Sequence, residues 1–187
     1  MPAIEIISGS VRTNRKSHRV ARYFKNYLET QQLATVSIID LQQYQFPLFE
    51  ERLSKLPTPS PALLDYAERI RKADGVIIIT PEYNGGYPAS VKNAIDVLYA
   101  EWHHKPIAIS TVSDGIFGGT QVITSLQFSL WKIKAWTVPT MFPVPQVDTA
   151  FDEAGNPTDK VGTDKRAAAF IEELLWCIEA KKKMTII

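Results

Sequence analysis

The stretch Val76-Ile77-Ile78-Ile79-Thr80 is apolar on both faces, which is typical of a central strand in a parallel sheet. Before it, the apolar residues of segment 63–70 have helical spacing, and Pro61 suits the start of that helix. After it come a glycine-bearing polar loop and a second helical segment, 90–102. A buried strand between two helices is the order that a parallel sheet with crossover helices requires.

The rest of the chain repeats this alternation. Further strands are expected at 3–8, 35–39, 106–110 and 136–142. Helices are expected from Ser17, as N-cap, at 122–133, and along an apolar stripe at 167–178. Since crossovers are right-handed, few topologies remain. We predict an α/β fold, a flavodoxin-like three-layer sandwich with a five-stranded parallel sheet in the order 2-1-3-4-5, forming a single domain over residues 1–187.

Composition excludes several classes of protein. The chain has 187 residues, of which 45% are hydrophobic and 22% charged, with a formal net charge of +1. No basic field points to nucleic acid, and no apolar run approaches the roughly 18 residues that span a bilayer. The N-terminus lacks the features of a signal peptide. A lone cysteine, Cys177, fits a reducing compartment, so we expect a soluble cytoplasmic protein and read this thiol as structural.

The loop after the first strand, Gly9-Ser10-Val11-Arg12-Thr13-Asn14-Arg15-Lys16-Ser17, has the parts of a phosphate site. It offers hydroxyl groups, a guanidinium and the N-terminus of a helix, where unpaired N–H groups attract anions. An ordinary turn with solvated basic residues is an equally good reading of this loop alone. Neither G-x-G-x-x-G nor G-x-x-x-x-G-K-[ST] occurs in the chain, which disfavours a dinucleotide-binding Rossmann site and a nucleotide triphosphatase.

Two more loops follow strands that end at the same edge of the sheet. Segment 80–88 (TPEYNGGYP) is rich in aromatic, amide and glycine residues that can wrap a flat heterocycle, and 111–119 (TVSDGIFGG) is a third glycine-bearing loop. Structural connections with Gly85-Gly86 as turn residues are the alternative. Convergence of the three loops favours a ligand site. The ligand that they suit is planar and bears a phosphate.

These loops resemble those of the NADPH-dependent FMN reductase family, which includes flavin, quinone, azo-dye and chromate reductases of flavodoxin-like fold. The resemblance rests mainly on PEYNGGYPASVKNAID (81–96), with GSVRTNRKS and STVSDGIFGG, and covers most of the chain. It implies FMN as cofactor and NADPH or NADH as electron donor. The residues that it assigns to the FMN phosphate are Ser10, Arg12 and Ser17, and those that it assigns to the isoalloxazine ring are Pro81, Glu82, Tyr83, Asn84, Ser113 and Gly115.

The chain also departs from this family. His18 stands where many relatives have asparagine, and Gln121 and Gln127 stand where several have arginines that join subunit-interface networks. The resemblance implies a homodimer built around the helix that carries Lys92 and Asp96, possibly a tetramer. An intrahelical ion pair is the plain reading of those two residues.

The expected function is that of an FMN-dependent NAD(P)H oxidoreductase acting by a ping-pong mechanism. Chemistry would occur at flavin N5 with no catalytic side chain, and the acceptor would be a quinone, a flavin, an azo dye or a similar small molecule. A flavodoxin-type electron carrier is the alternative, disfavoured by the net charge of +1 and by the arginine-bearing loop. A third possibility is an interaction module without flavin.

Other conspicuous residues carry no assigned chemistry. No metal site is expected at His103-His104, because further ligands at suitable spacing are missing. We read His18 as a surface or interface histidine. The four tryptophans, Trp102, Trp131, Trp136 and Trp176, are assigned to the core or to an interface.

Overall fold

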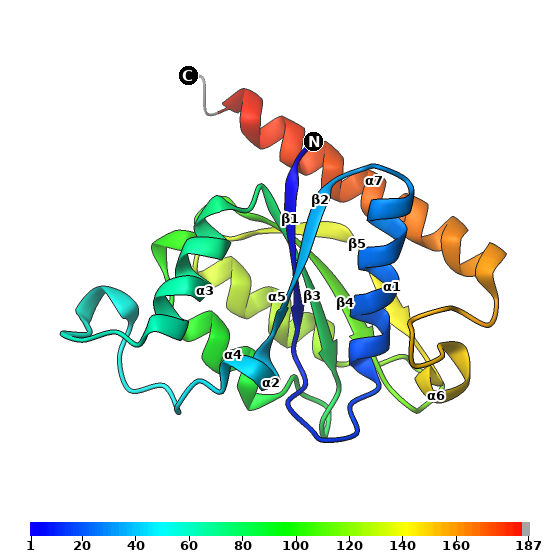
Figure 1. The fold of residues 1–187 in the computed structure, drawn as a ribbon, viewed down its shortest axis with the longest axis horizontal. Coiled ribbons are helices and arrows are strands. Elements are labelled where there is room, and N and C mark those ends of the chain that lie inside the picture. Colours follow the sequence, from blue (N-terminus) through cyan, green and yellow to red (C-terminus); the bar gives the residue numbers. More distant parts are fainter. Residues whose placement is uncertain (185–187) are drawn as a thin grey trace.

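A computed structural model describes residues 1–184 and confirms the predicted sheet (Figure 1). Its strands are all parallel, in the order β2-β1-β3-β4-β5. The strands are β1 (Ala3–Ser8), β2 (Thr35–Asp40), β3 (Gly75–Pro81), β4 (Pro106–Val112) and β5 (Trp136–Val144). The central strand β3 is buried along its whole length, as its apolar sequence predicts.

Helices cover both faces of the sheet (Figure 1). They are α1 (Ser17–Thr30), α2 (Leu41–Tyr44), α3 (Pro61–Lys72), α4 (Ala89–Asp96), α5 (Val122–Lys132), α6 (Val147–Ala150) and α7 (Lys160–Met184), with the 3₁₀ helices η1 (Leu53–Lys55) and η2 (Ala100–Trp102). One core cluster packs α1 and α7 on one face, and a second packs α3, α4 and α5 on the other.

The alternation of side chains along each strand divides these two cores. Ile77 and Ile79 of β3 join the α1/α7 cluster, whereas Val76 and Ile78 join the α3/α4/α5 cluster. Because both faces of a parallel sheet are covered, all four side chains are fully buried.

Strand β1 has the predicted bounds, and the other four predicted strands are too short at their carboxyl ends. Strand β4 continues to Val112 and β5 to Val144, so Thr111, predicted in a loop, is a buried strand residue. Its hydroxyl donates to the carbonyl of Gly118 at 2.7 Å, which ties the following loop to the strand end. The strand hydrogen bonding therefore continues up to the point where the polar loops begin.

The single helix predicted at 90–102 is wrong. Helix α4 ends at Asp96, and η2 forms a separate turn at Ala100–Trp102. The carbonyl of Val97 accepts the amide of Leu53 at 2.8 Å, a tertiary bond that replaces the helical ladder. The Trp102 indole is fully buried and donates to the carbonyl of Ile95 at 3.1 Å. Of the other tryptophans, Trp131 and Trp176 are mostly exposed, so they do not belong to the core.

Candidate functional site

A cavity of about 480 Å³ opens at the carboxyl edge of the sheet, where the loops after β1, β3 and β4 meet. This size lies within the range of small-molecule sites. Eight of the nine residues predicted for the site line it. The full lining is Ser10, Arg12, Asn14, Arg15, Lys16, Ser17, Pro81, Glu82, Tyr83, Val112, Ser113, Asp114, Gly115 and Val147.

The loop after β1 presents its hydroxyls and one arginine to this cavity. Ser10 is buried, and its Oγ lies 2.7 Å from the hydroxyl of Tyr83, so the first and second loops touch across the site. The exposed Arg12 guanidinium lies 5.7 Å from the centre of the Tyr83 ring. No ion pair engages Arg12 within residues 1–184, so its charge is free to meet an anion.

Ser17 does not cap helix α1, contrary to the prediction. The flanking residue is Lys16, whose φ of −82° and ψ of −25° are already helical, and no side chain caps this end. Ser17 is itself the first helical residue and lines the cavity, where its buried Oγ has no hydrogen-bond partner. The first turn of α1 also contains no acidic residue. A buried, unpartnered hydroxyl beside a helix N-terminus suits a phosphate oxygen.

The other two cations of the loop are already engaged. Arg15 pairs with the buried carboxylate of Asp40 at the end of β2. Burial alone would raise the pKa of Asp40, but the hydrogen bonds and charge of Arg15 hold it below its usual value. Lys16 lies 3.0 Å from Asp148 and 3.5 Å from Asp114.

His18 is partly enclosed. It is half-buried, and its Nδ1 lies 3.0 Å from the hydroxyl of Ser8, at the end of β1. Burial, and then the charge of Arg15, lower the pKa of His18. Helix α1 turns one side of this ring toward the strand end, but the ring stays partly exposed, so the prediction of a surface or interface histidine is not contradicted. An interface role stays untested.

The second loop contains a tight turn. The backbones of Tyr83 and Gly86 exchange hydrogen bonds of 2.8 and 3.1 Å, and Asn84 and Gly85 between them have φ of 53° and 79°. Positive φ at both central positions explains why the sequence is Asn-Gly. Asn84 is exposed and lies outside the cavity lining. The amides of Glu82 and Tyr83 already donate to backbone carbonyls, so neither N–H is free for a ligand in this conformation.

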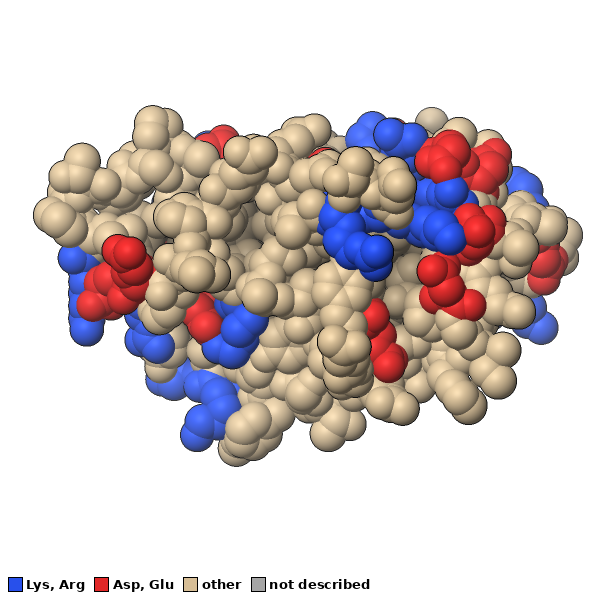
Figure 2. Space-filling view, turned by 90° about the horizontal axis from the view of Figure 1, so that it is seen from below, with Lys and Arg blue, Asp and Glu red and all other residues tan. Residues whose placement is uncertain are grey.

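The third loop closes the site on the side of α6. The Ser113 hydroxyl donates to the carbonyl of Gly115 at 3.1 Å, and the Val147 amide donates to the carbonyl of Ser113. Figure 2 looks onto this edge and shows Lys and Arg side chains gathered against Asp and Glu side chains. Lys16 and Arg19, paired with Asp114, Asp148 and Glu153, form such a group.

Sequence reasoning missed Val147 and the role of Asp40. Val147 belongs to a four-residue helix that the apolar pattern does not reveal. The contact between Asp40 and Arg15 joins positions that are 25 residues apart, and no local signal links them.

Within residues 1–184, no group of His, Cys, Asp or Glu side chains is arranged to hold a metal ion. No helix in the same range is both long enough and apolar enough to cross a membrane.

Comparisons with known proteins agree with the loop pattern. Residues 2–149 match the family model described as NADPH-dependent FMN reductase. A Saccharomyces cerevisiae protein named NAD(P)H-dependent FMN reductase is 36% identical over 144 residues, which cover 70% of this chain and 74% of that protein. A quinone reductase of Pseudomonas putida is 30% identical over 166 residues, which cover 84% of this chain and 86% of that protein.

A similar fold is found in a solved structure, the flavoenzyme NAD(P)H:(acceptor) oxidoreductase FerB of Paracoccus denitrificans. Its TM-score is 0.76 at 23% identity, with 96% of this chain and 98% of that chain covered. At this identity the match supports the fold.

Proposed function

Because this chain belongs to the NADPH-dependent FMN reductase family, we propose that it binds FMN in the cavity at the carboxyl edge of the sheet and reduces a small acceptor with electrons from NADPH or NADH. FMN, when bound, supplies hydride acceptance and return at its N5 atom. The protein itself would then bind and orient the FMN and leave one side of its ring accessible. No catalytic side chain is required.

The single observation that carries the proposal is the buried hydroxyl of Ser17. It has no partner, it lines the cavity, and it lies in the first turn of a helix without acidic residues. A phosphate there would accept from this hydroxyl and from the helix N–H groups. Arg12 would add a charge-assisted contact, and Ser10 would complete the phosphate site.

The ring would lie toward the second and third loops. Pro81, Glu82 and Tyr83 line the cavity on one side, and Ser113 and Gly115 line it on another. Asn84 remains a proposed contact only if the turn rearranges, because it is outside the lining. Residues 1–184 hold no second nucleotide-binding domain. Donor and acceptor would therefore use the same open side in turn, which predicts ping-pong kinetics.

The family resemblance also leads us to propose a domain extent, a location, an oligomeric state and classes of acceptor. One domain would span residues 1–187, and the protein would work in the cytoplasm as a homodimer, or as a tetramer if Gln121 and Gln127 permit it. Quinones, flavins and azo dyes are the acceptor classes that we propose, supported by a relative named quinone reductase. A flavodoxin-type electron carrier is the second candidate, and the net charge of +1 argues against it.

Replacing Arg12 tests the phosphate assignment. Arg12→Ala should raise the dissociation constant of FMN by about 10- to 100-fold, because charged hydrogen bonds contribute roughly 1.5–3 kcal/mol. The measurement is a titration that follows quenching of flavin fluorescence. Riboflavin, which lacks the phosphate, is the control ligand, and its affinity should change little. An unchanged FMN dissociation constant would sink the assignment.

A second assay separates the reductase from the electron carrier. NADPH oxidation is followed by its absorbance, with a quinone as acceptor and the FMN-loaded protein as catalyst. We expect steady consumption of NADPH and parallel lines in double-reciprocal plots at several quinone concentrations. An FMN-loaded protein that leaves NADPH untouched would instead be a carrier, and a purified protein that takes up no FMN would be neither.

A further inference from the structure

Arg15 and Asp40 form a tie beneath the loop after β1. Both terminal nitrogens of Arg15 donate to the Asp40 carboxylate, and Nη1 also donates to the carbonyl of Ser10 at 3.1 Å. The Asp40 side chain is only 6% exposed and that of Arg15 11%. A planar guanidinium that bridges a carboxylate and a carbonyl fixes both in position.

The tie connects the phosphate loop to the neighbouring strand. Asp40 is the last residue of β2, and its Oδ1 accepts the amide of Gln42 at 3.1 Å, so its carboxylate is itself held by the start of α2. Gln42 adds a second link, since its Nε2 donates to the carbonyl of Arg12 at 3.3 Å. The backbone at Ser10 and at Arg12 is thus anchored from the β2 side.

We propose that Arg15 is a positioning residue of the cofactor site: together with Asp40 it holds the Ser10–Arg12 backbone in a binding geometry, and it is not a ligand of the phosphate. This inference rests on the proposed function, since the ligand is FMN. Within the loop, Arg12 then supplies the charge that meets the phosphate, while the charge of Arg15 is neutralised inside the protein.

The two possible roles of Arg15 predict opposite effects of one substitution. Asp40→Asn removes the negative charge and leaves the side chain the same size. If Arg15 is a ligand of the phosphate, this change frees its guanidinium from Asp40, so FMN would bind as well as before or more tightly. If Arg15 is a positioning residue, it loses the carboxylate that anchors it, and FMN would bind more weakly.

The test compares FMN and riboflavin dissociation constants for the wild type, Arg15→Ala, Asp40→Asn and the double variant. We expect each single variant to weaken FMN binding by about tenfold, the scale on which supporting partners of a binding group act. The double variant should bind FMN no more weakly than either single variant, because both changes break the same Arg15–Asp40 tie. Riboflavin binding should change less than FMN binding. Unchanged or tighter FMN binding by Asp40→Asn, or equal losses for both flavins, would overturn the proposal.

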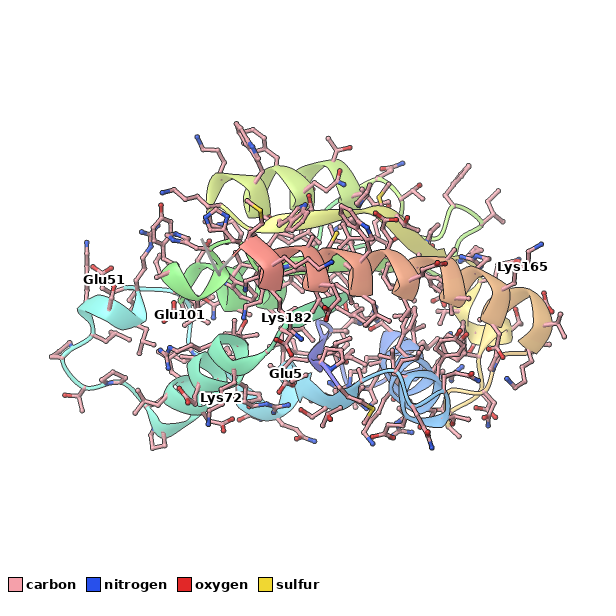
Figure 3. The ribbon with its side chains drawn as sticks, turned by 90° about the horizontal axis from the view of Figure 1, so that it is seen from above. Glu5, Glu51, Lys72, Glu101, Lys165 and Lys182 are labelled. Atoms are coloured by element: carbon pink, nitrogen blue, oxygen red, sulfur yellow. The ribbon has the colours of Figure 1, made fainter. Side chains whose placement is uncertain are left out.

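Glu5→Gln provides the matched control for general destabilisation. Glu5 and Arg69 form another partly buried, two-point ion pair, with side chains 13% and 25% exposed. Glu5 lies within β1 and does not line the cavity; Figure 3, drawn from the side opposite to Figure 2, labels it. FMN affinity should stay within about twofold of the wild type in Glu5→Gln, whereas a loss as large as that of Asp40→Asn would overturn the positioning role.

Hydrogen exchange of the backbone amides of residues 9–17 gives an answer without flavin. Asp40→Asn should speed exchange in this loop, and Glu5→Gln should not. Absence of FMN binding in the wild type would defeat the proposed function alone, because the exchange rates would still test the tie. Unchanged exchange in Asp40→Asn would overturn the tie even in a protein that binds FMN.

Discussion

Gly9 is the residue at which strand β1 gives way to the cofactor loop, and it touches two other elements. Its amide donates to the carbonyl of Ile79 at 2.9 Å, and a side chain there would contact Val91 of α4. The added Cβ would also lie 2.9 Å from the same Ile79 carbonyl oxygen. Space, and not a left-handed backbone, is what requires glycine here.

We therefore expect Gly9→Ala to lower the free energy of unfolding by about 1–3 kcal/mol, the usual effect of overpacking. Urea denaturation followed by circular dichroism measures it. Gly86→Ala is the matched control, because the nearest atom to its new Cβ is 3.8 Å away and its φ is not positive. Equal losses in the two variants would contradict a packing role for Gly9.

At this scale the sequence predicts residue types better than it predicts their partners. The hydroxyls of Ser10 and Ser17 and the guanidinium of Arg12 all line the cavity, as expected from a polar loop after a buried strand. Arg15 could not be told apart from Arg12 by its position in the loop. Its engagement depends on Asp40, which only the pairing of β1 with β2 brings near.

Helices α1 and α3 begin in different ways, and two serines show the consequence. Ser60 has an extended backbone, and its hydroxyl accepts the amide of Leu63 at 3.2 Å, with Pro61 as the next residue. Ser17 lies inside the first turn of α1 and caps nothing. Both serines precede helical patterns, so the sequence alone does not distinguish them. The dihedral angles of the serine itself decide which one is a cap, because an N-cap residue is extended, as Ser60 is, and Ser17 is already part of the helix.

We expect Ser60→Ala to lower the free energy of unfolding by about 1 kcal/mol and to leave FMN binding unchanged. Ser17→Ala should show the reverse pattern, with stability equal to or above that of the wild type, because a buried unsatisfied hydroxyl is removed. Its FMN affinity should fall. Urea denaturation and flavin fluorescence titration of both variants check the pair. A destabilised Ser17→Ala with normal FMN affinity would restore the capping role.

Elements with a continuous apolar pattern were predictable, and those made by tertiary contacts were not. The stripe along α7 correctly identified its buried face, but the helix extends to Lys160 and Met184 through exposed polar turns that carry no such pattern. Likewise, the apolar residues up to Trp102 suggested one long helix. The contact of Val97 with Leu53 ends that helix, and Leu53 is far away in sequence.

At the scale of the whole molecule, residues 1–184 form two cores that share one sheet, and this sharing bears on how the protein unfolds. Adjacent residues of β3 and of β1 point into opposite cores: Ile6 packs on the α1/α7 side and Ile7 on the other. If the strands detach from one core, the side chains that they contribute to the other core also become exposed to solvent. Such sharing favours a single cooperative transition, as expected of the one domain that we propose.

Two matched substitutions on opposite faces test this cooperativity. Ile70 of α3 and Ile171 of α7 are both buried, one in each cluster. Ile70→Val and Ile171→Val should each lower the free energy of unfolding by about 1 kcal/mol. Their effects should add in the double variant to within about 0.5 kcal/mol, since the two residues belong to separate clusters on opposite faces of the sheet. With Trp131, Trp136 and Trp176 replaced by phenylalanine, tryptophan fluorescence reports on the buried Trp102 of one cluster, and far-ultraviolet circular dichroism reports on helices of both faces. The two probes should give coincident urea transitions in every variant, because the shared strands couple the faces. A variant in which fluorescence and circular dichroism separate would mean that the two faces unfold as independent units.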